Sequence, residues 1–391
     1  MKNAHLLNKN IKHLCSGGGE AIPLFKVFMP KSVMKPLKEV LFSGYVGEGP
    51  RVEEFERKLA SWFGSENVLT LNSGTSAIQL ALRLANVGQG DEVISTPMTC
   101  VATNEPILSI GAKIVWADID PDTGNIDPED VAKKITKKTK AIIVVHWGGY
   151  PCELEPLKAL AATHGIKLIE DACHAFGATY HGKPIGSISD FTCFSFQAIK
   201  EITTIDGGAL VCKFKKDAER GRLLRWYGID RKCNRKDFRC EEDIKEYGYK
   251  FHMNDVAATI GIEQLKYVEA NLKKNRVNAA QYNDAFSSLA NIASLNYQKD
   301  RVSSYWLYTL RVKNPLAFTT WMKKAKIIIS RVHARNDLHT MFKDSIIDLP
   351  GVDEFVSSQV CIPVGWWLTQ AEVAYIIDTI ANYDPDRKGK K

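Results

Sequence analysis

Short runs of β-branched and apolar residues alternate with segments of helical period between about Val52 and Phe214. Helices are predicted between the runs, for example at 77–85 and at 154–163, where Gly165 follows as a stop signal. This alternation is typical of a mostly parallel sheet with helices on both faces, so we expect a large α/β domain. The predicted strands are 68–71, 92–95, 113–117, 141–145, 167–170, 191–196 and 209–212.

The pattern changes after Met253. A long helical stretch is predicted from about 256 to 285, then a strand-like segment at 306–312 and a last helix near 371–381. These elements indicate a smaller C-terminal α+β domain. We therefore expect a polar N-terminal tail over 1–20, a large domain over 21–270 and a small domain over 271–391.

Composition narrows the class of protein. The 391 residues suit two globular domains, and 45% hydrophobic with 25% charged residues is close to the average for globular chains. No window approaches the roughly 18 apolar residues of a membrane span, and the polar first 19 residues lack a secretory signal. A cytoplasmic location without membrane contact is expected.

Charge and cysteine usage argue against two further classes, nucleic-acid-binding proteins and proteins stabilised by metal ions or disulfides. The net charge is +7, but the lysines and arginines are scattered, which favours a solvated surface over a nucleic-acid footprint while remaining compatible with an anionic ligand. The basic end at 387–391 is expected to be a frayed tail. The nine cysteines show neither paired metal-ligand spacing nor a disulfide framework, so reduced thiols and no metal site are expected.

The first motif with chemical content is the segment 71–77, where a predicted strand passes through Gly74 directly into a helix. Free backbone N–H groups and the positive helix end can hold a phosphate there, assisted by the hydroxyls of Thr75 and Ser76. Taken alone, the segment is better explained as an ordinary helix cap, since Ser and Thr are common there.

The second motif closes a buried strand with Glu170 and Asp171, followed by His174. Ligands of open α/β sheets bind at the carboxyl ends of the strands. An acid there can pair with a pyridinium nitrogen and make a cofactor ring an electron sink. A solvated strand end with a structural histidine is the alternative interpretation.

The third motif runs from Phe194 through Lys200 to Gly207 and Gly208. A lysine shortly after an apolar strand can be partly buried, which lowers its pKa and frees the amine to form a Schiff base. A single lysine is usually a surface residue. The order of phosphate turn, strand-end acid, lysine and paired glycines is what favours a catalytic role.

Together these motifs resemble the DegT/DnrJ/EryC1/StrS family of sugar aminotransferases, which have the aspartate-aminotransferase type of fold and use pyridoxal 5'-phosphate (PLP). The resemblance covers most of the chain and is most specific at 170–177 and 194–208. Further family-like segments lie at 21–24, 47–50 and 53–56.

The resemblance implies a role for each matching residue. Lys200 corresponds to the lysine that holds PLP and moves the proton, Asp171 to the partner of the pyridine nitrogen, and His174 to the residue beside the ring hydroxyl. The predicted phosphate contacts are Gly74, Thr75, Ser76 and Ser195.

The sequence departs from the family at the ring and at the subunit contact. Cys100 stands where the family usually has an aromatic residue that stacks on the cofactor ring. Lys250 and His252 stand where an asparagine and an arginine are usual, in a segment that crosses to the neighbouring subunit's phosphate. The resemblance thus implies a homodimer with shared active sites and leaves open which side chain reaches that phosphate. The glutamate of the usual Gly-Glu-Gly-Gly ending reads Asp206, a milder change.

The leading hypothesis is a transaminase that aminates a nucleotide-linked keto sugar, such as a 4-keto-6-deoxy hexose, with L-glutamate as donor. In this hypothesis the amino group is carried on pyridoxamine phosphate between two half-reactions. The expected context is deoxyamino-sugar biosynthesis, such as that of a lipopolysaccharide O-antigen. A PLP-dependent sugar dehydratase is an alternative, but such relatives have a histidine in place of the lysine. A non-catalytic PLP-binding regulatory protein would lack the lysine or the acid. Arg231, His333 and Arg335, in the loops 227–239 and 330–339, are candidates to meet a diphosphate.

Overall fold

The computed structural model describes residues 21–231, 233, 237, 243–345 and 347–384. The predicted N-terminal tail, the basic end at 387–391 and part of the loop 227–239 lie outside these residues. Within the described part, no helix is long and apolar enough to cross a membrane.

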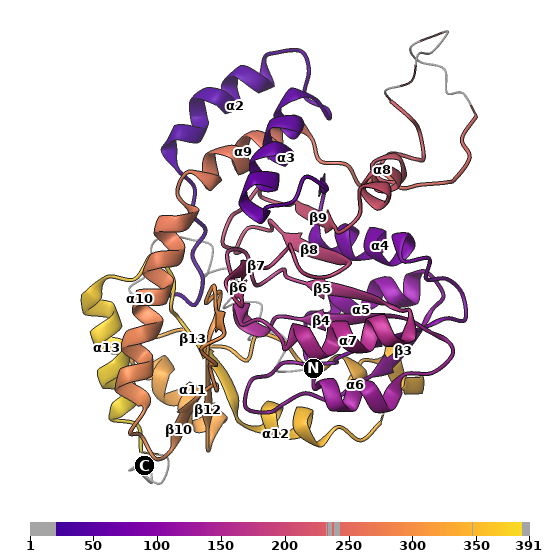
Figure 1. Cartoon of the computed structure of the whole chain (residues 1–391). Helices are drawn as coiled ribbons and strands as arrows, with labels where there is room; N and C mark the ends of the chain where they lie inside the picture. Colours follow the sequence, from indigo (N-terminus) through magenta and orange to yellow (C-terminus); the bar gives the residue numbers. More distant parts are fainter. Residues whose placement is uncertain (1–20, 232, 234–236, 238–242, 346, 385–391) are drawn as a thin grey trace.

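A seven-stranded sheet forms the centre of the larger part of the molecule (Figure 1). Its strand order is β1-β9-β8-β5-β4-β2-β3, and only β9 runs antiparallel to both of its neighbours. This sheet confirms the expected α/β class with a mostly parallel sheet. The strands are β1 (Val68–Leu71), β2 (Glu92–Ser95), β3 (Lys113–Trp116), β4 (Thr139–Val145), β5 (Lys167–Asp171), β8 (Phe191–Ser195) and β9 (Gly208–Cys212).

Alternation along each strand builds a core on both faces of the sheet. In β4, Ala141 and Ile143 join one hydrophobic cluster, whereas Ile142 and Val144 join the other. Successive side chains of a strand point to opposite faces, so an all-apolar strand must be covered twice. The helices of this part are α3 (Pro50–Phe63), α4 (Gly74–Leu84), α5 (Val101–Ser109), α6 (Pro128–Lys134), α7 (Leu154–His164), α8 (Lys215–Leu224) and α9 (Asp255–Leu265).

The C-terminal part packs helices against a small antiparallel sheet, as expected for an α+β unit. Its sheet order is β10-β12-β13, and a further small sheet joins β11 to β6 and β7. Its elements are α10 (Val268–Phe286), β10 (Ile292–Ser294), β12 (Tyr308–Val312), α11 (Pro315–Lys324), α12 (Pro350–Ser358), β13 (Gln359–Ile362) and α13 (Gln370–Ala381). The short elements are η1 (Lys31–Val33), α2 (Met34–Leu41), η2 (Trp147–Gly149), β6 (Thr179–Tyr180), β7 (Lys183–Pro184), β11 (Arg301–Val302), η3 (Asn336–Leu338) and η4 (Thr340–Ser345).

Two details differ from a simple linear division of the chain. Ile22 packs in the C-terminal cluster, and its N–H donates to the Lys326 carbonyl over 2.9 Å. Phe342 and Phe355, from the C-terminal part of the sequence, pack in the large domain's core. The division at 270/271 stays a prediction, and it falls inside α10.

The single helical stretch predicted from about 256 to 285 is wrong in one respect, because the chain leaves helical geometry between α9 and α10. Lys266 and Tyr267 close tight turns back to Glu263 and Gln264, and Tyr267 has φ −117°. No glycine or proline marks this break. The Tyr267 ring packs on Phe28, with 5.5 Å between ring centres, so a tertiary contact accompanies the change of direction.

Candidate active site

Segments far apart in the sequence meet at the carboxyl ends of β5 and β8, where open α/β sheets bind ligands. Asp171 ends β5, Ser195 ends β8 and Gly74 begins α4. A Cβ atom on Gly74 would lie 2.9 Å from both Cys173 Sγ and Ser195 Cβ. Similarly, a Cβ on Gly208 would lie 2.4 Å from the backbone oxygen that precedes Gly74. Only glycine permits these approaches, so the predicted phosphate turn lies directly beside both strand ends.

The turn that opens α4 is held by its own side chains. Ser73 caps the helix by accepting a hydrogen bond of 3.0 Å from the Ser76 N–H, and Ser76 Oγ donates to Asn72 Oδ1 over 2.7 Å. The first N–H groups of a helix have no acceptor within the helix, so Gly74 and Thr75 present theirs at its positive end. The turn is thus both an ordinary cap and a suitable anion cradle, although the Ser76 hydroxyl is engaged inside it.

Asp171 is 4% exposed, and both of its carboxylate oxygens accept hydrogen bonds. The Thr103 hydroxyl donates to Oδ2 over 2.6 Å, and the Cys173 N–H donates to Oδ1 over 3.0 Å. An ionised carboxylate has about four acceptor positions. Asp171 therefore retains capacity for a further donor, such as a pyridinium N–H.

Lys200 packs its amine on an aromatic face: its Nζ lies 3.8 Å from the centre of the Trp306 ring. The indole N–H donates to the Ile199 carbonyl over 2.9 Å, which fixes the ring. Burial lowers the pKa of Lys200, although the nearby Cys173 and Glu201 act in the opposite direction. A lowered pKa increases the fraction of the amine that is unprotonated at a given pH, and a nucleophilic lysine must be unprotonated to react.

Two stacked histidines adjoin the lysine. The His174 ring lies 3.8 Å from Trp306 and 5.4 Å from His333, centre to centre, and the two imidazoles are within 5° of parallel. Burial, with the charge of Lys200 in addition, lowers the pKa of His174 well below its usual range and that of His333 to about 4. Both rings are therefore neutral near pH 7. His174 Nδ1 and His333 Nε2 are buried without a hydrogen-bond partner among the described residues, which leaves them available to a ligand.

Glu201 brings a second ionisable group to the lysine. Its Oε1 accepts a hydrogen bond of 2.9 Å from Ser304 Oγ, and its Oε2 is buried without a partner in the described structure. Burial raises the pKa of Glu201 to about 7, while the positive charge of Lys200 opposes the rise. The carboxyl thus titrates near neutral pH.

This shift predicts a pH-dependent stability. Because the folded chain keeps the Glu201 proton from pH 4.5 up to about 7 and the unfolded chain loses it, the free energy of unfolding should fall as the pH rises through that window. Glu201→Gln removes this ionisation. The free energy of unfolding of the variant, measured relative to that of wild type, should therefore be about 2 kcal/mol higher at pH 8 than at pH 5. Urea unfolding at both pH values measures this, with the exposed Glu155→Gln as control. An equal difference at the two pH values would contradict the assignment.

Cys100 occupies the N-cap position of α5, where its side chain makes no capping hydrogen bond, and it is partly buried. It lies close enough to Lys200 to oppose slightly the lowering of that amine's pKa by burial. The thiol therefore belongs to the same neighbourhood as the lysine. Its predicted position over a cofactor ring stays a prediction.

The stretch with Lys250 and His252 runs beside the turn of its own chain, where the Asn72 N–H donates to the Phe251 carbonyl over 2.7 Å. Lys250 is exposed, with Nζ 5.9 Å from the Trp226 ring centre. The His252 ring meets the same indole edge-on at 3.8 Å, and burial lowers its pKa to about 4. Contact of either side chain with a neighbouring subunit's phosphate stays a prediction.

The two arginines singled out for a diphosphate already face carboxylates. Arg231 Nη1 lies 2.9 Å from Glu48 Oε2. Arg335 pairs with Asp337 at 2.7 Å and also with Asp353. A diphosphate would have to compete with these acids, so the predicted contact stays a prediction.

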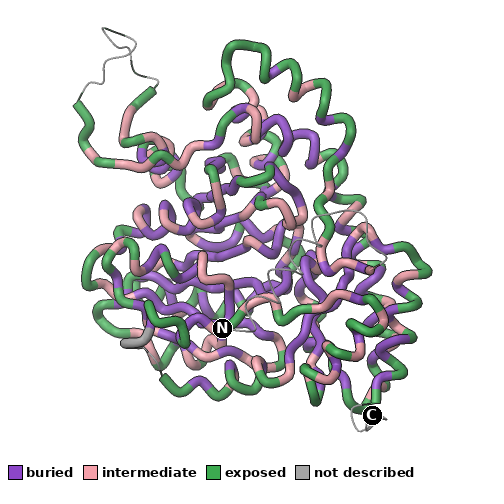
Figure 2. Tube along the Cα trace, turned by 180° about the vertical axis from the view of Figure 1, so that it is seen from behind, coloured by how far each residue is buried: buried purple, intermediate pink, exposed green. Residues whose placement is uncertain are grey.

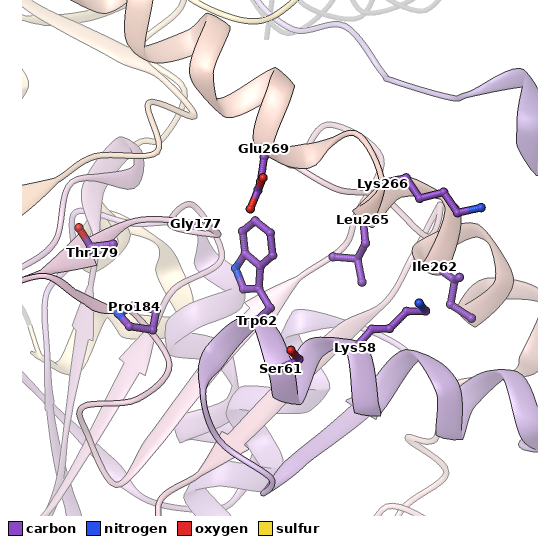
Figure 3. A pocket seen from close by; sticks show the side chains of 10 residues that line it. All are labelled: Lys58, Ser61, Trp62, Gly177, Thr179, Pro184, Ile262, Leu265, Lys266 and Glu269. Carbon is purple, nitrogen blue, oxygen red and sulfur yellow. The ribbon is translucent and has the colours of Figure 1, made fainter.

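A surface cavity of about 570 Å³ opens where α3, α9 and the start of α10 meet (Figure 3). The Trp62 indole lies in its middle and stacks on Phe176, with 5.2 Å between ring centres. The cavity has no lining residue in common with the candidate site. Its lining residues are Lys58, Ser61, Trp62, Gly177, Thr179, Pro184, Ile262, Leu265, Lys266 and Glu269.

No group of three or more His, Cys, Asp or Glu side chains in the described ranges is placed to hold a metal ion.

Sequence reasoning missed Trp306, Glu201 and Thr103. Trp306 opens the strand-like segment that was predicted only as structure, and Glu201, which directly follows the lysine, was assigned no role. Thr103 lies in the same segment as Cys100, and its distance from Asp171 along the chain hides their contact. Only the proximity of Glu201 to Lys200 was a usable signal in the sequence.

Comparison with known proteins shows the family to which a chain with this site is similar. Residues 29–381 match the DegT/DnrJ/EryC1/StrS aminotransferase family. The UDP-4-amino-4,6-dideoxy-N-acetyl-beta-L-altrosamine transaminase of Campylobacter jejuni is 31% identical over 364 residues, which span 89% of this chain and 93% of that protein.

Solved structures agree with this match. The sugar aminotransferase CalS13 from Micromonospora echinospora superposes with a TM-score of 0.89 at 38% identity, covering 92% of this chain and 99% of that one. Spr1654 from Streptococcus pneumoniae, described as a sugar aminotransferase, is 29% identical and covers 92% of this chain and 98% of its own. Its PMP and PLP forms superpose with TM-scores of 0.86 and 0.85, which supports dependence on this cofactor pair in the family.

Proposed function

The chain belongs to the DegT/DnrJ/EryC1/StrS aminotransferase family, and we propose that it uses PLP to move an amino group from L-glutamate to a nucleotide-linked keto sugar. The convergence of an amine, a carboxylate and a helix N-terminus at the ends of β5 and β8 is the observation that carries this proposal. The sugar aminotransferases among its relatives support the substrate class.

The residues present fit the cofactor. The turn at Gly74 and Thr75 offers backbone N–H groups to its phosphate, and the Ser195 side chain lies beside that turn. Asp171 retains an acceptor for the pyridine N–H, and His174 Nδ1 has no partner in the described structure. When bound, PLP supplies an electron sink that lets a proton leave the neighbouring carbon.

Lys200 has two roles in this proposal. Its lowered pKa favours the free amine, which holds the cofactor covalently. After release, Nζ takes and returns the proton of the reacting carbon. The Trp306 face at 3.8 Å stabilises the protonated state of Nζ by about 0.5–2 kcal/mol.

The neutral histidines define the polar contacts around this amine. His174 is proposed to meet the ring hydroxyl, and His333 to meet a hydroxyl of the sugar. Both roles follow from buried ring nitrogens without protein partners among the described residues. A neutral His333 is a hydrogen-bonding group, so the structure favours a sugar hydroxyl over the diphosphate as its target.

The proposed acceptor is a 4-keto-6-deoxy hexose on a nucleotide. A panel of nucleotide-linked keto sugars, offered beside simple 2-oxo acids while glutamate consumption is followed, tests this. Turnover with a sugar nucleotide only is expected. Turnover with 2-oxo acids alone would overturn the substrate class, loss of a sugar hydroxyl without glutamate consumption would identify a dehydratase, and binding without turnover would identify a regulatory protein.

A homodimer is also proposed. Large apolar side chains gather along α2 and the segment after it, where exposed residues dominate (Figure 2), and Phe42 is 82% exposed. Such a patch marks an interaction surface, and a second copy would cover it. The other members are Met34 at 67%, Leu41 at 51%, Tyr45 at 50% and Val46 at 46%.

The dimer can be tested at this patch. Phe42→Asp buries a charge at the proposed interface and should yield a monomer, as measured by sedimentation equilibrium, whereas wild type should sediment as a dimer. The exposed Leu316→Asp, on α11, is the control. A dimeric Phe42→Asp variant would place the interface elsewhere. The cytoplasmic location and the O-antigen pathway stay predictions.

A further inference from the structure

A buried chain of hydrogen bonds connects the segment that carries His333 with the turn before α5. Asn104 Nδ2 donates to Asn336 Oδ1 over 2.8 Å, and Asn336 Nδ2 donates to the Thr99 carbonyl over 2.9 Å. The Asn336 backbone N–H donates to the Pro97 carbonyl over 2.8 Å. Asn104 and Asn336 are 0% and 1% exposed, so these contacts are shielded from water.

The side-chain amide of each asparagine has one orientation in which its oxygen and its N–H groups all find hydrogen-bond partners. Asn104 Oδ1 accepts from Ser95 Oγ over 2.7 Å, while its Nδ2 also donates to the Thr96 carbonyl over 3.0 Å. The second Asn336 Nδ2 hydrogen is directed to the Ala334 carbonyl at 3.3 Å. With donors and acceptors matched, the pair fixes the turn against the segment that carries His333.

The series of hydrogen bonds continues from this turn to Asp171. Thr99 Oγ1 and Thr103 Oγ1 lie 2.7 Å apart, and Thr103 Oγ1 lies 2.6 Å from Asp171 Oδ2. A threonine hydroxyl has one proton, and Thr103 directs it to the carboxylate. Thr99 must then donate to Thr103, so the two hydroxyls point in sequence toward Asp171.

We propose that Thr103 is a positioning residue that fixes the Asp171 carboxylate opposite the cofactor's pyridine nitrogen, and that the Asn104–Asn336 pair holds the turn that orients Thr103. The short bond to Oδ2 and the Cys173 N–H bond to Oδ1 set the carboxylate plane between them. Since Asn336 lies three residues after His333 in the sequence, the same pair also fixes the segment that carries His333. This inference rests on the proposed role of Asp171.

Thr103→Val tests the first link, because valine has the same shape without the hydroxyl. We expect kcat to fall about 10- to 100-fold in both half-reactions with KM nearly unchanged, which corresponds to the loss of a hydrogen bond to a charged group. The ¹⁵N NMR signal of labelled cofactor should move toward the unprotonated pyridine nitrogen. Thr103→Ser should restore both readouts. Thr259→Val is the matched control, since Thr259 is 1% exposed and its hydroxyl donates only to the Asp255 carbonyl.

Asn336→Ala tests the second link. It should move the ¹⁵N signal in the same direction and lower kcat about 3- to 10-fold, and it should add little to Thr103→Val in the double variant. The control is Asn278→Ala, which replaces a 2% exposed asparagine whose amide donates to the Val364 carbonyl over 2.9 Å, a partner outside the hydrogen bonds that lead to Asp171. Equal effects of Asn336→Ala and Asn278→Ala would reduce the pair to a purely structural role and overturn the second link.

Asp171→Asn separates the possible failures. If Asp171→Asn changes the ¹⁵N signal and Thr103→Val does not, the positioning role of Thr103 is wrong while the proposed function stands. If Asp171→Asn itself leaves the ¹⁵N signal unchanged, the proposed role of Asp171 fails and the inference about Thr103 fails with it.

Discussion

Replacing Lys200 with alanine is expected to abolish transamination, with turnover at least about 10³-fold lower, while the chain still folds. The amine is both the proposed attachment point for the cofactor and the group that moves the proton, and no other lysine among the described residues contacts Trp306. The folded state loses a cation–π contact of about 0.5–2 kcal/mol, which is small beside the total stability of a domain. Single-turnover rates with glutamate measure the first effect, and urea unfolding measures the second.

The covalent attachment gives an independent measurement. Borohydride reduction of the PLP-loaded wild type should leave the cofactor attached to the peptide that contains Lys200, with a mass gain equal to the cofactor minus one water plus two hydrogens, and the alanine variant should gain none. Lys167→Ala, which removes a lysine at the other end of β5, is the control and should behave as wild type. An alanine variant that turns over at the wild-type rate would remove Lys200 from the mechanism.

Asp171→Asn should cost much more activity than cofactor binding. An amide cannot balance the positive charge of a protonated pyridine nitrogen, and removing one partner of a buried ion pair commonly costs about 3–5 kcal/mol. That corresponds to about 10²–10⁴-fold in the rate of the glutamate half-reaction. Cofactor affinity should change less, because the phosphate turn at Gly74 and the covalent bond to Lys200 remain.

Asp118→Asn is the matched control for this variant. Its carboxylate is likewise held by hydrogen bonds, from the backbone N–H groups of Gly351 and Val352 at 2.8 Å each and of Ile119 at 2.9 Å, and none of these partners belongs to the candidate site. This variant should lose stability and keep the rate of the half-reaction. A fast half-reaction in Asp171→Asn would mean that another acid meets the pyridine nitrogen.

Much of the fold could be predicted because local patterns and tertiary packing agree. The strand at 191–196 and the helix at 154–163 were predicted within one residue, since an apolar run and a glycine stop each act locally. The break at Lys266 and Tyr267 was missed because both residues are compatible with a helix, and only the packing of Tyr267 accompanies the turn. The place of Ile22 in the C-terminal cluster was equally invisible, because it depends on pairing with Ile327.

The sequence by itself identified the candidate groups: an acid at a strand end, a lysine after the following strand of the large sheet and a glycine turn that can hold a phosphate. These signals lie within short segments whose local geometry follows from the residues themselves. Tertiary structure alone decided which side chains surround the amine. Trp306 and His333 arrive from more than 100 residues away, and so does Asn336, whose contact with Asn104 leads to Asp171. Such contacts depend on how two packed units meet, and no local periodicity records that.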